Sequence, residues 1–177
     1  MVVKGGPTQD EIMAISLFKL GLREGDIVAD IGCGTGRVSR ELAKTAGRVI
    51  AIDRRPEAAA CTREYAAEAE VGNLDVYLGE AVDILPLQGP LDCAFVGGSG
   101  NLETVLDILA AQVRRTIVVN AVLLDTVFRA ACAMQTLGIF YEVVHVQVSR
   151  SYSLAGGIAL KPINPVYIIV GRVNDAC

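Results

Sequence analysis

The chain has 177 residues, of which 52% are hydrophobic, and it carries a formal net charge of −4 from 16 Lys and Arg against 20 Asp and Glu. This length suits one domain with a single sizeable core, so we expect residues 1–177 to form one domain. The acidic balance, without a basic stripe, argues against a nucleic acid partner, and the lack of an apolar run of roughly 18 residues argues against a membrane partner.

The N-terminal segment predicts a cytoplasmic protein that begins with a helix. The apolar part of residues 1–7 is too short for a secretory signal, so a cytoplasmic location is expected. Thr8 and Glu11 have the spacing of a capping box, and apolar residues follow them at helical intervals. Gly21 is expected to end this helix, because glycine readily adopts the left-handed conformation that closes helices.

Residues 30–36 have the pattern D-x-G-x-G-x-G and lie between an apolar strand (26–30) and a helical stretch (37–46). Glycine lets the backbone turn sharply and approach a ligand, because it has no Cβ. The helix that follows directs its unpaired N–H groups and the positive end of its dipole to the same place. The pattern predicts a site for a nucleotide-like cofactor at the carboxyl end of the first strand, although a plain tight turn would use the same glycines.

The glycine spacing indicates which cofactor to expect. A dinucleotide site needs G-x-G-x-x-G or G-x-G-x-x-A, and Arg37 stands at the last position of that pattern. The observed spacing instead resembles motif I of the S-adenosylmethionine-dependent methyltransferases, where backbone N–H groups would suit the cofactor's carboxylate and Asp30 would face its cationic end. Asp53 ends the next strand (48–53), at a spacing typical of an acid that binds ribose hydroxyls; its alternative role is to cap the helix after Pro56.

The rest of the chain alternates between strands and helices. The expected elements are a helix over 56–70, strands over 75–80 and 91–96, a glycine-rich loop over 97–100, a helix over 101–113, a strand over 116–121, a helix from 124 to Gly138, and an antiparallel pair of strands within 140–148 and 164–173. This order predicts an α/β fold of the Rossmann-like, class I methyltransferase type. Its mostly parallel seven-stranded sheet would end in a C-terminal antiparallel hairpin, with helices on both faces.

Several other residues are assigned structural roles. Five cysteines without CxxC spacing predict reduced thiols and no metal site. His145, the only histidine, lies in a strand-like run and is interpreted as structural. The arginine pairs at 54–55 and 114–115 are explained as solvated surface charges. Asn120 ends the fifth strand, where it either orients a substrate group or caps the next helix.

Further motifs give the chain a specific resemblance. They are residues 6–8 (G-P-T), 30–36, 51–54 (A-I-D-R), 56–57 (P-E), 79–81 (G-E-A), 96–100 (V-G-G-S-G) and 120–124 (N-A-V-L-L). The glycine loop alone is weak evidence, whereas G-P-T, V-G-G-S-G and N-A-V-L-L in this order are much more specific. Over nearly its whole length, the chain resembles the decarboxylating cobalt-precorrin-6B (carbon-15) methyltransferases of anaerobic cobalamin (vitamin B12) biosynthesis.

The resemblance implies S-adenosylmethionine as the cofactor and a tetrapyrrole, cobalt-precorrin, as the substrate. The implied reaction methylates carbon-15 of the macrocycle and removes carbon dioxide from a ring acetate, which converts cobalt-precorrin-6B to cobalt-precorrin-7. The conjugated macrocycle itself supplies the carbon nucleophile and the electron sink, so no catalytic residue is assigned. A homo-oligomer is also implied, with a tetramer built on the C-terminal strands as its suggested form. The alternatives are a methyltransferase for another substrate, such as RNA, and a cofactor-binding module without turnover.

The resemblance also implies particular site residues. The implied contacts with the cofactor are made by Thr8, Gly32, Cys33, Gly34, Thr35, Gly36, Asp53 and Ala81. Ala81 would touch the adenine through its backbone at the end of the third strand. Because a precorrin carries many carboxylates, Arg37, Arg150 and Lys161 are candidate anchors on loops near the carboxyl edge of the sheet, although a solvated surface charge explains each of them more simply. Arg37 and Asn101 depart from the family pattern, which has a small residue and a glycine there.

Overall fold

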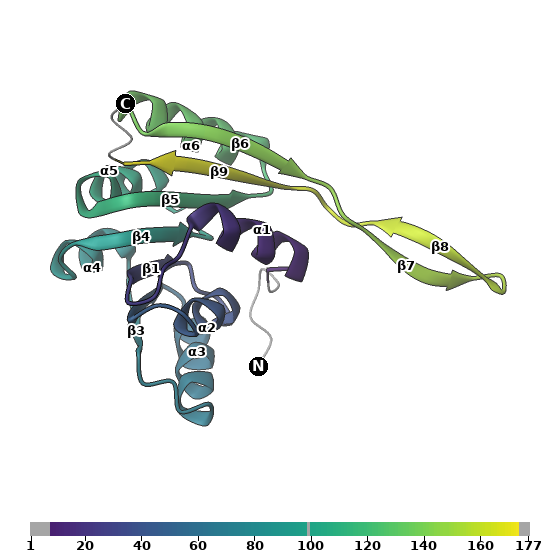
Figure 1. Ribbon diagram of the computed structural model, residues 1–177, viewed down its shortest axis with the longest axis horizontal. Helices are drawn as coiled ribbons and strands as arrows, with labels where there is room; N and C mark the ends of the chain where they lie inside the picture. The colour runs from purple at the N-terminus through teal and green to yellow at the C-terminus, as the bar shows by residue number, and fades with distance from the viewer. Residues whose placement is uncertain (1–7, 99, 174–177) are drawn as a thin grey trace.

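The computed structural model describes residues 8–98 and 100–173, which form a helix-covered sheet and a separate two-stranded ribbon (Figure 1). The elements up to the third strand are α1 (Asp10–Leu20), β1 (Ile27–Ile31), α2 (Arg37–Ala43), β2 (Arg48–Asp53), α3 (Pro56–Glu68) and β3 (Leu74–Leu78). The next are α4 (Ala81–Ile84), η1 (Leu85–Leu87), β4 (Leu91–Val96), α5 (Leu102–Gln112), β5 (Val113–Ala121) and α6 (Leu124–Thr136). The last are β6 (Phe140–Val146), β7 (Ser149–Leu154), β8 (Gly157–Pro162) and β9 (Val166–Arg172). Gly6 and Pro7 of the G-P-T segment, and Ser99 of the glycine-rich loop, lie outside the described residues.

The seven-stranded sheet has the order β3-β2-β1-β4-β5-β9-β6. β9 runs antiparallel to its neighbours β5 and β6, and the remaining neighbours are parallel. The expected mostly parallel sheet with a C-terminal antiparallel hairpin is therefore confirmed. The chain runs from β1 outward to β2 and β3, then returns to place β4 on the other side of β1. The carboxyl ends of β1 and β4 thus form a topological switch point, where open α/β sheets bind ligands.

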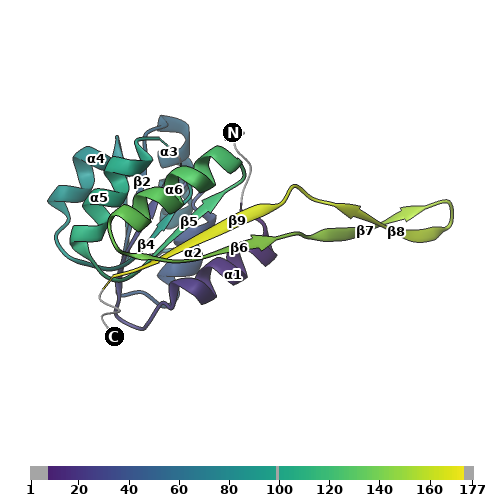
Figure 2. The same cartoon turned by 90° about the horizontal axis from the view of Figure 1, so that it is seen from above.

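Both faces of the sheet are buried, because successive side chains of a strand point to opposite faces. In β2, Ile50 and Ile52 belong to the core that packs under α5 and α6, whereas Val49 and Ala51 belong to the core under α1 and α2. Figure 2 shows α1 and α6 on opposite sides of the sheet. The apolar runs of the sequence therefore fill two core layers.

Of the predictions made for both ends of α1 and for the end of β3, one is confirmed and two are wrong. Gly21 ends α1 with φ of +63°, as expected. The capping box is wrong: the N-cap of α1 is Gln9, which makes no side-chain capping hydrogen bond, so the Thr8 hydroxyl has no capping role. The third strand ends at Leu78, and Ala81 opens the short helix α4 instead of ending that strand. A helix of one turn is too short to leave a periodic pattern in the sequence.

The ribbon formed by β7 and β8 has no counterpart in the sequence prediction. Its strands pair in antiparallel register from Ser149↔Pro162 to Leu154↔Gly157, and it projects away from the main sheet (Figure 1). All of β7 is exposed. Neither strand contributes to the two cores, so the ribbon lacks the half-buried alternation by which strands are recognised.

Arg115 has a structural role and is not the solvated surface charge expected from the sequence. Its guanidinium donates to both carboxylate oxygens of Asp26, at 3.0 and 2.5 Å, and the Asp26 side chain is buried. Burial opposes the charge of Asp26, but hydrogen bonds from Arg115 and from the backbone of Arg23 hold its pKa below the ordinary value. This ion pair ties β5 to the residue that precedes β1.

Replacing Arg115 by Met should destabilise the fold, because it leaves the Asp26 carboxylate buried without its partner. We expect the free energy of unfolding to fall by about 3 kcal/mol in denaturant titrations near pH 7. Arg114→Met is the matched control, since Arg114 bonds Asp92 from a largely exposed position, and it should cost at most about 1 kcal/mol. Equal losses for the two variants would contradict the assignment.

Candidate functional site

A cavity of about 660 Å³ lies at the carboxyl ends of β1, β2, β4 and β5. The loops that follow these strands line it, and so does the segment after β3 that contains Ala81. Thr8 and Gln9, which precede α1, and Ile12 of α1 also line it. The cavity therefore occupies the switch point that the strand order creates. Its volume is that of a typical small-molecule site.

Two positions of the loop after β1 require glycine for two reasons: the backbone is left-handed there, and a Cβ would collide with neighbouring atoms. Gly32 and Gly36 have φ of +77° and +72°. A Cβ on Gly32 would lie 2.8 Å from the backbone nitrogen of Gly98, and one on Gly36 would lie 2.8 Å from Cγ2 of Thr62. The loops after β1 and β4 therefore touch through bare backbone, and α2 starts directly against α3. A plain tight turn would not require these contacts.

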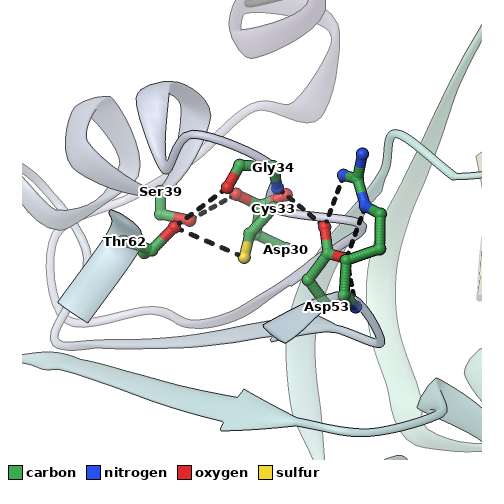
Figure 3. A network of polar contacts seen from close by, with 7 residues as sticks. Asp30, Cys33, Gly34, Ser39, Asp53 and Thr62 are labelled. Carbon is green, nitrogen blue, oxygen red and sulfur yellow. Dashed lines mark hydrogen bonds and ion pairs between the residues drawn. The ribbon is translucent and has the colours of Figure 1, made fainter. Parts of the chain in front are cut away.

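Asp53 belongs to a polar network beside this loop (Figure 3). Its Oδ2 accepts a hydrogen bond from the Gly34 nitrogen at 3.0 Å and one from the Arg55 guanidinium at 2.9 Å. Its Oδ1 accepts from the Arg55 backbone nitrogen and from Arg55 Nε, both at 3.0 Å. Burial opposes the charge of Asp53, but these hydrogen bonds outweigh it and keep the pKa of Asp53 below its ordinary value. The carboxylate is therefore charged at neutral pH.

This network overturns two sequence-based alternatives. The N-cap of α3 is Arg55, with no side-chain capping bond, so Asp53 does not cap that helix. Arg55 is not a solvated surface charge, because it binds a carboxylate that is 3% exposed. Its neighbour Arg54 is largely exposed and pairs with Glu80 at 3.5 Å. The two adjacent arginines thus have different environments.

Asp30 lies beneath the loop and lines the cavity, but its side chain is fully buried. Its Oδ2 accepts a 2.5 Å hydrogen bond from Ser39 Oγ, and its Oδ1 has no partner among the described residues. Burial raises the pKa of Asp30 from 3.8 to about 7, against the opposing effect of Ser39 and with a further contribution from the charge of Asp53. Figure 3 shows Asp30, bonded to Ser39, and Asp53, bonded to Gly34, in the polar contacts around the glycine loop.

Sequence reasoning missed Ser39, Thr62 and Arg55. The hydroxyl of Thr62 donates to the Gly34 carbonyl at 3.3 Å and lies 3.6 Å from Cys33 Sγ. Burial raises the pKa of the Cys33 thiol to about 12, so this cysteine is unreactive at neutral pH. Ser39 and Thr62 stand on the buried faces of α2 and α3. In the sequence, these two residues could have been noticed as hydroxyl side chains at helix positions that are otherwise apolar.

The structure brings together nearly all of the residues expected at the cofactor site. Those that line the cavity are Thr8, Gly32, Cys33, Gly34, Thr35, Asp53 and Ala81. Gly36 is not among the lining residues and instead starts α2.

The expected substrate anchors are dispersed. Arg37 lines the cavity and forms an ion pair with Asp10 of α1. The expectation of loops near the carboxyl edge is wrong for Arg150 and Lys161, which face each other across the ribbon strands β7 and β8. Arg150 still reaches α1, where it pairs with Glu11 at 2.8 Å.

The structure also shows the surroundings of Asn120 and His145. Asn120 lines the cavity, and its Nδ2 donates to Ser16 Oγ at 2.9 Å. It does not cap α6, whose N-cap is Leu123. His145 lies in β6 and stacks on Tyr167, with ring centroids 4.7 Å apart. It is not among the residues that line the cavity.

Comparisons with known proteins identify the family. The family model described as a precorrin methyltransferase domain matches residues 3–172. A relative from Methanosarcina acetivorans is 50% identical over 175 residues, which cover 96% of this chain and 95% of the relative. The chain belongs to the precorrin methyltransferase family. That relative is named a probable cobalt-precorrin-6B C(15)-methyltransferase (decarboxylating).

Solved structures of this family share the fold. Precorrin 8W decarboxylase from Methanobacterium thermoautotrophicum has a TM-score of 0.89 and 34% identity, covering 94% of this chain and 91% of its own. Precorrin-6Y C5,15-methyltransferase from Geobacter metallireducens has a TM-score of 0.90 and 30% identity, with coverages of 97% and 94%. A tRNA (m1A58) methyltransferase from Aquifex aeolicus, 14% identical with a TM-score of 0.77, shares the fold alone. The class I methyltransferase fold is thus confirmed.

Two features are absent from residues 8–98 and 100–173. Within these ranges no three His, Cys, Asp or Glu side chains are grouped so that they can hold a metal ion. None of the described helices has the length and apolar character needed to cross a membrane. The cytoplasmic location and the absence of a nucleic acid partner stay predictions.

Replacing Asp30 by Asn should change how stability depends on pH. Because the folded protein raises the pKa of Asp30 to about 7, its contribution to stability is fully present below about pH 4 and is lost as the pH rises through about 7. Relative to Asp30→Asn, the wild type should lose about 4 kcal/mol of unfolding free energy between these limits. Urea titrations at a series of pH values measure this difference.

Ser39→Ala serves as the companion variant. It removes the hydroxyl that favours the charged form of Asp30, so the pH at which this stability is lost should move upward. Parallel pH profiles for the wild type and Asp30→Asn would contradict the shifted pKa of Asp30.

Proposed function

We propose that the protein uses S-adenosylmethionine to methylate carbon-15 of cobalt-precorrin-6B and to remove carbon dioxide from a ring acetate, giving cobalt-precorrin-7. The observation that carries the proposal is a cavity at the switch point, built on the D-x-G-x-G-x-G loop, in a chain of the precorrin methyltransferase family. The name of the Methanosarcina acetivorans relative supports this substrate and this carbon position. On this proposal residues 1–177 act as one cytoplasmic domain of cobalamin biosynthesis.

The residues around the cavity fit S-adenosylmethionine. Gly32 has no Cβ, so the loops after β1 and β4 meet through bare backbone and leave the cavity beside them open to a nucleoside-sized ligand. Asp30 Oδ1 is a buried acceptor without a partner among the described residues, and it suits the cationic end of the cofactor. Asp53 suits the ribose hydroxyls. On this proposal the cofactor contacts are Thr8, Gly32, Cys33, Gly34, Thr35, Gly36, Asp53 and Ala81.

The chain's own residues would mainly orient the reactants. The cofactor supplies an electrophilic methyl group, and the conjugated macrocycle supplies the carbon nucleophile and accepts the electrons that decarboxylation releases. Arg37 lines the cavity and pairs with Asp10, and on this proposal its guanidinium would bind a substrate carboxylate. Beside the cavity, Val122, Leu123 and Leu124 are 62%, 63% and 56% exposed, which gives an apolar ring system a surface to pack on. Placement of this kind lowers barriers without a strong protein base.

The activity test supplies the pure protein with S-adenosylmethionine and cobalt-precorrin-6B. We expect one methyl group to be added and one carbon dioxide to be released per substrate, measured by mass spectrometry and by trapping of the labelled gas. Cofactor binding without either product would instead indicate a binding module. Methylation of RNA but not of the tetrapyrrole would also contradict the proposed substrate.

Replacing Asp53 by Asn should weaken binding of S-adenosylhomocysteine, the demethylated cofactor, because the amide is a poorer acceptor for ribose hydroxyls. Loss of charge-assisted hydrogen bonds predicts a decrease of about 10- to 100-fold, measured by calorimetry. Asp75→Asn is the matched control, since Asp75 lies on β3 in an exposed pair with Arg48, and it should bind like the wild type. Tight binding of an adenine dinucleotide in place of S-adenosylhomocysteine would reject the site.

We also propose that the protein is a homo-oligomer, with a tetramer as the suggested form, and that the ribbon of β7 and β8 forms part of its contacts. An isolated two-stranded ribbon is at best marginally stable in water, yet this one exposes large apolar side chains. Ile158 and Leu160 on one face are 85% and 69% exposed, and Tyr152 and Leu154 on the other are 44% and 55% exposed. A second copy of the chain would cover these surfaces.

Replacing Ile158 and Leu160 together by Ser should reduce the mass of the oligomer in solution, because it removes apolar area from the proposed contact. Light scattering coupled to gel filtration measures this mass. Leu87→Ser, at an 81% exposed position on η1, is the control and should keep the wild-type mass. A monomeric wild type, or an unchanged mass for the double variant, would overturn this assembly.

A further inference from the structure

We propose that the guanidinium of Arg55 occupies the ribose-binding position of Asp53 in the free protein, and that the cofactor binds only after this side chain leaves. The inference rests on the proposed function, because it takes Asp53 as the group that binds ribose. Binding of the cofactor would have to replace the contact between Arg55 and Asp53. Arg55 would therefore help to determine the affinity for the cofactor.

The acceptor positions of Asp53 are all in use. A carboxylate offers about four lone-pair positions, and four donors approach this one at 2.9 to 3.0 Å. Two of them are the backbone nitrogens of Gly34 and Arg55, and the other two are nitrogens of the Arg55 guanidinium. A pair of ribose hydroxyls therefore finds no open position on this carboxylate.

The two kinds of donor differ in how easily they can be exchanged. The backbone nitrogens belong to the loops that shape the cavity, so their bonds to Asp53 persist when a ligand enters. The Arg55 side chain is 35% exposed and lines the cavity, so this long flexible side chain can turn into solvent once other donors take its place on Asp53. The same guanidinium lies 3.9 Å from the position a Cβ of Gly34 would take. It therefore covers part of the glycine loop as well.

The charges around Asp53 explain why an arginine stands there in the free protein. The carboxylate is 3% exposed, and a buried charge without a partner is strongly destabilising. Arg55 supplies that partner until the ribose hydroxyls replace it. The hydrogen bond to Asp53 raises the pKa of Arg55, and the nearby charge of Glu57 on α3 adds to this effect. Glu57 is thus an acidic group near which the displaced guanidinium can stay.

This exchange predicts opposite effects on stability and on affinity. If the open state holds about a tenth of the free protein, the apparent affinity is about tenfold weaker than that of a site that is always open. Removing the guanidinium should therefore increase the apparent affinity by about tenfold. It should also lower the melting temperature of the free protein, because Asp53 loses its partner. A residue that merely holds Asp53 in place would have the reverse effect on affinity.

The test measures the dissociation constant of S-adenosylhomocysteine by calorimetry for the wild type and for Arg55→Leu. We expect the variant to bind roughly tenfold more tightly, and its ligand-free form to melt at a lower temperature. Arg63→Leu is the matched control, because Arg63 lies in α3, the helix that follows Arg55, and bonds the Val76 carbonyl from an exposed position. It should bind like the wild type.

A second variant and a second measurement guard against a failure to fold. Arg55→Gln keeps a shorter polar side chain and should also tighten binding. In the wild type, the NMR signal of the Arg55 Nε–H group should shift towards that of a solvated arginine when S-adenosylhomocysteine is added.

The outcomes separate this inference from the proposed function. A wild type that binds no S-adenosylhomocysteine would reject the proposed function and the inference together. A wild type that binds, combined with unchanged or weaker binding by a folded Arg55 variant, would overturn the inference alone. In the Asp53→Asn background, a gain from Arg55→Leu as large as in the wild type would also contradict it.

Discussion

The parallel pairing of β1 with both β2 and β4 is the constraint on which the site depends. Ile31 at the end of β1 is in register with Ile52 and with Val96, so the three strands end within one residue of one another. The backbone then continues the contact beyond the sheet: the Gly32 nitrogen donates to the Ile52 carbonyl at 2.8 Å, and the Gly97 nitrogen donates to the Ile31 carbonyl at 2.8 Å. The loops that follow these three strands therefore meet at one point and form one wall of the cavity.

The close approach of these strand ends buries two acids, Asp30 and Asp53, and their surroundings give them different charge states. Asp53 receives four donors and keeps its pKa below the ordinary value. Among the described residues Asp30 has one side-chain partner, Ser39, and burial raises its pKa to about 7. The fold thus presents two acids at the cavity: Asp53, which stays charged at the proposed ribose position, and Asp30, which is easily protonated beneath the proposed position of the cofactor's cationic end. Perturbed acids in a cavity are typical of functional sites.

Much of the fold and the position of the cavity could be predicted because local patterns carry them. The D-x-G-x-G-x-G loop encodes its own turn, and buried parallel strands leave long apolar runs. Arg55 could not be assigned in this way, because neighbouring arginines look alike in a sequence and only the folded chain brings one of them onto Asp53. The β7–β8 ribbon was missed because it has no core side to create a pattern. The capping box predicted at Thr8 does not form, because α1 starts one residue later than the motif predicts, with Gln9 as its N-cap. Helix ends are set to within only one or two residues by local sequence.

The most direct test is a crystal structure of the protein soaked with S-adenosylhomocysteine. The account predicts density for the nucleoside between the loop of residues 32–36 and the end of β2, with the ribose hydroxyls on Asp53 and the Arg55 side chain turned away. A nucleoside bound elsewhere, or an empty loop at saturating ligand, would contradict it.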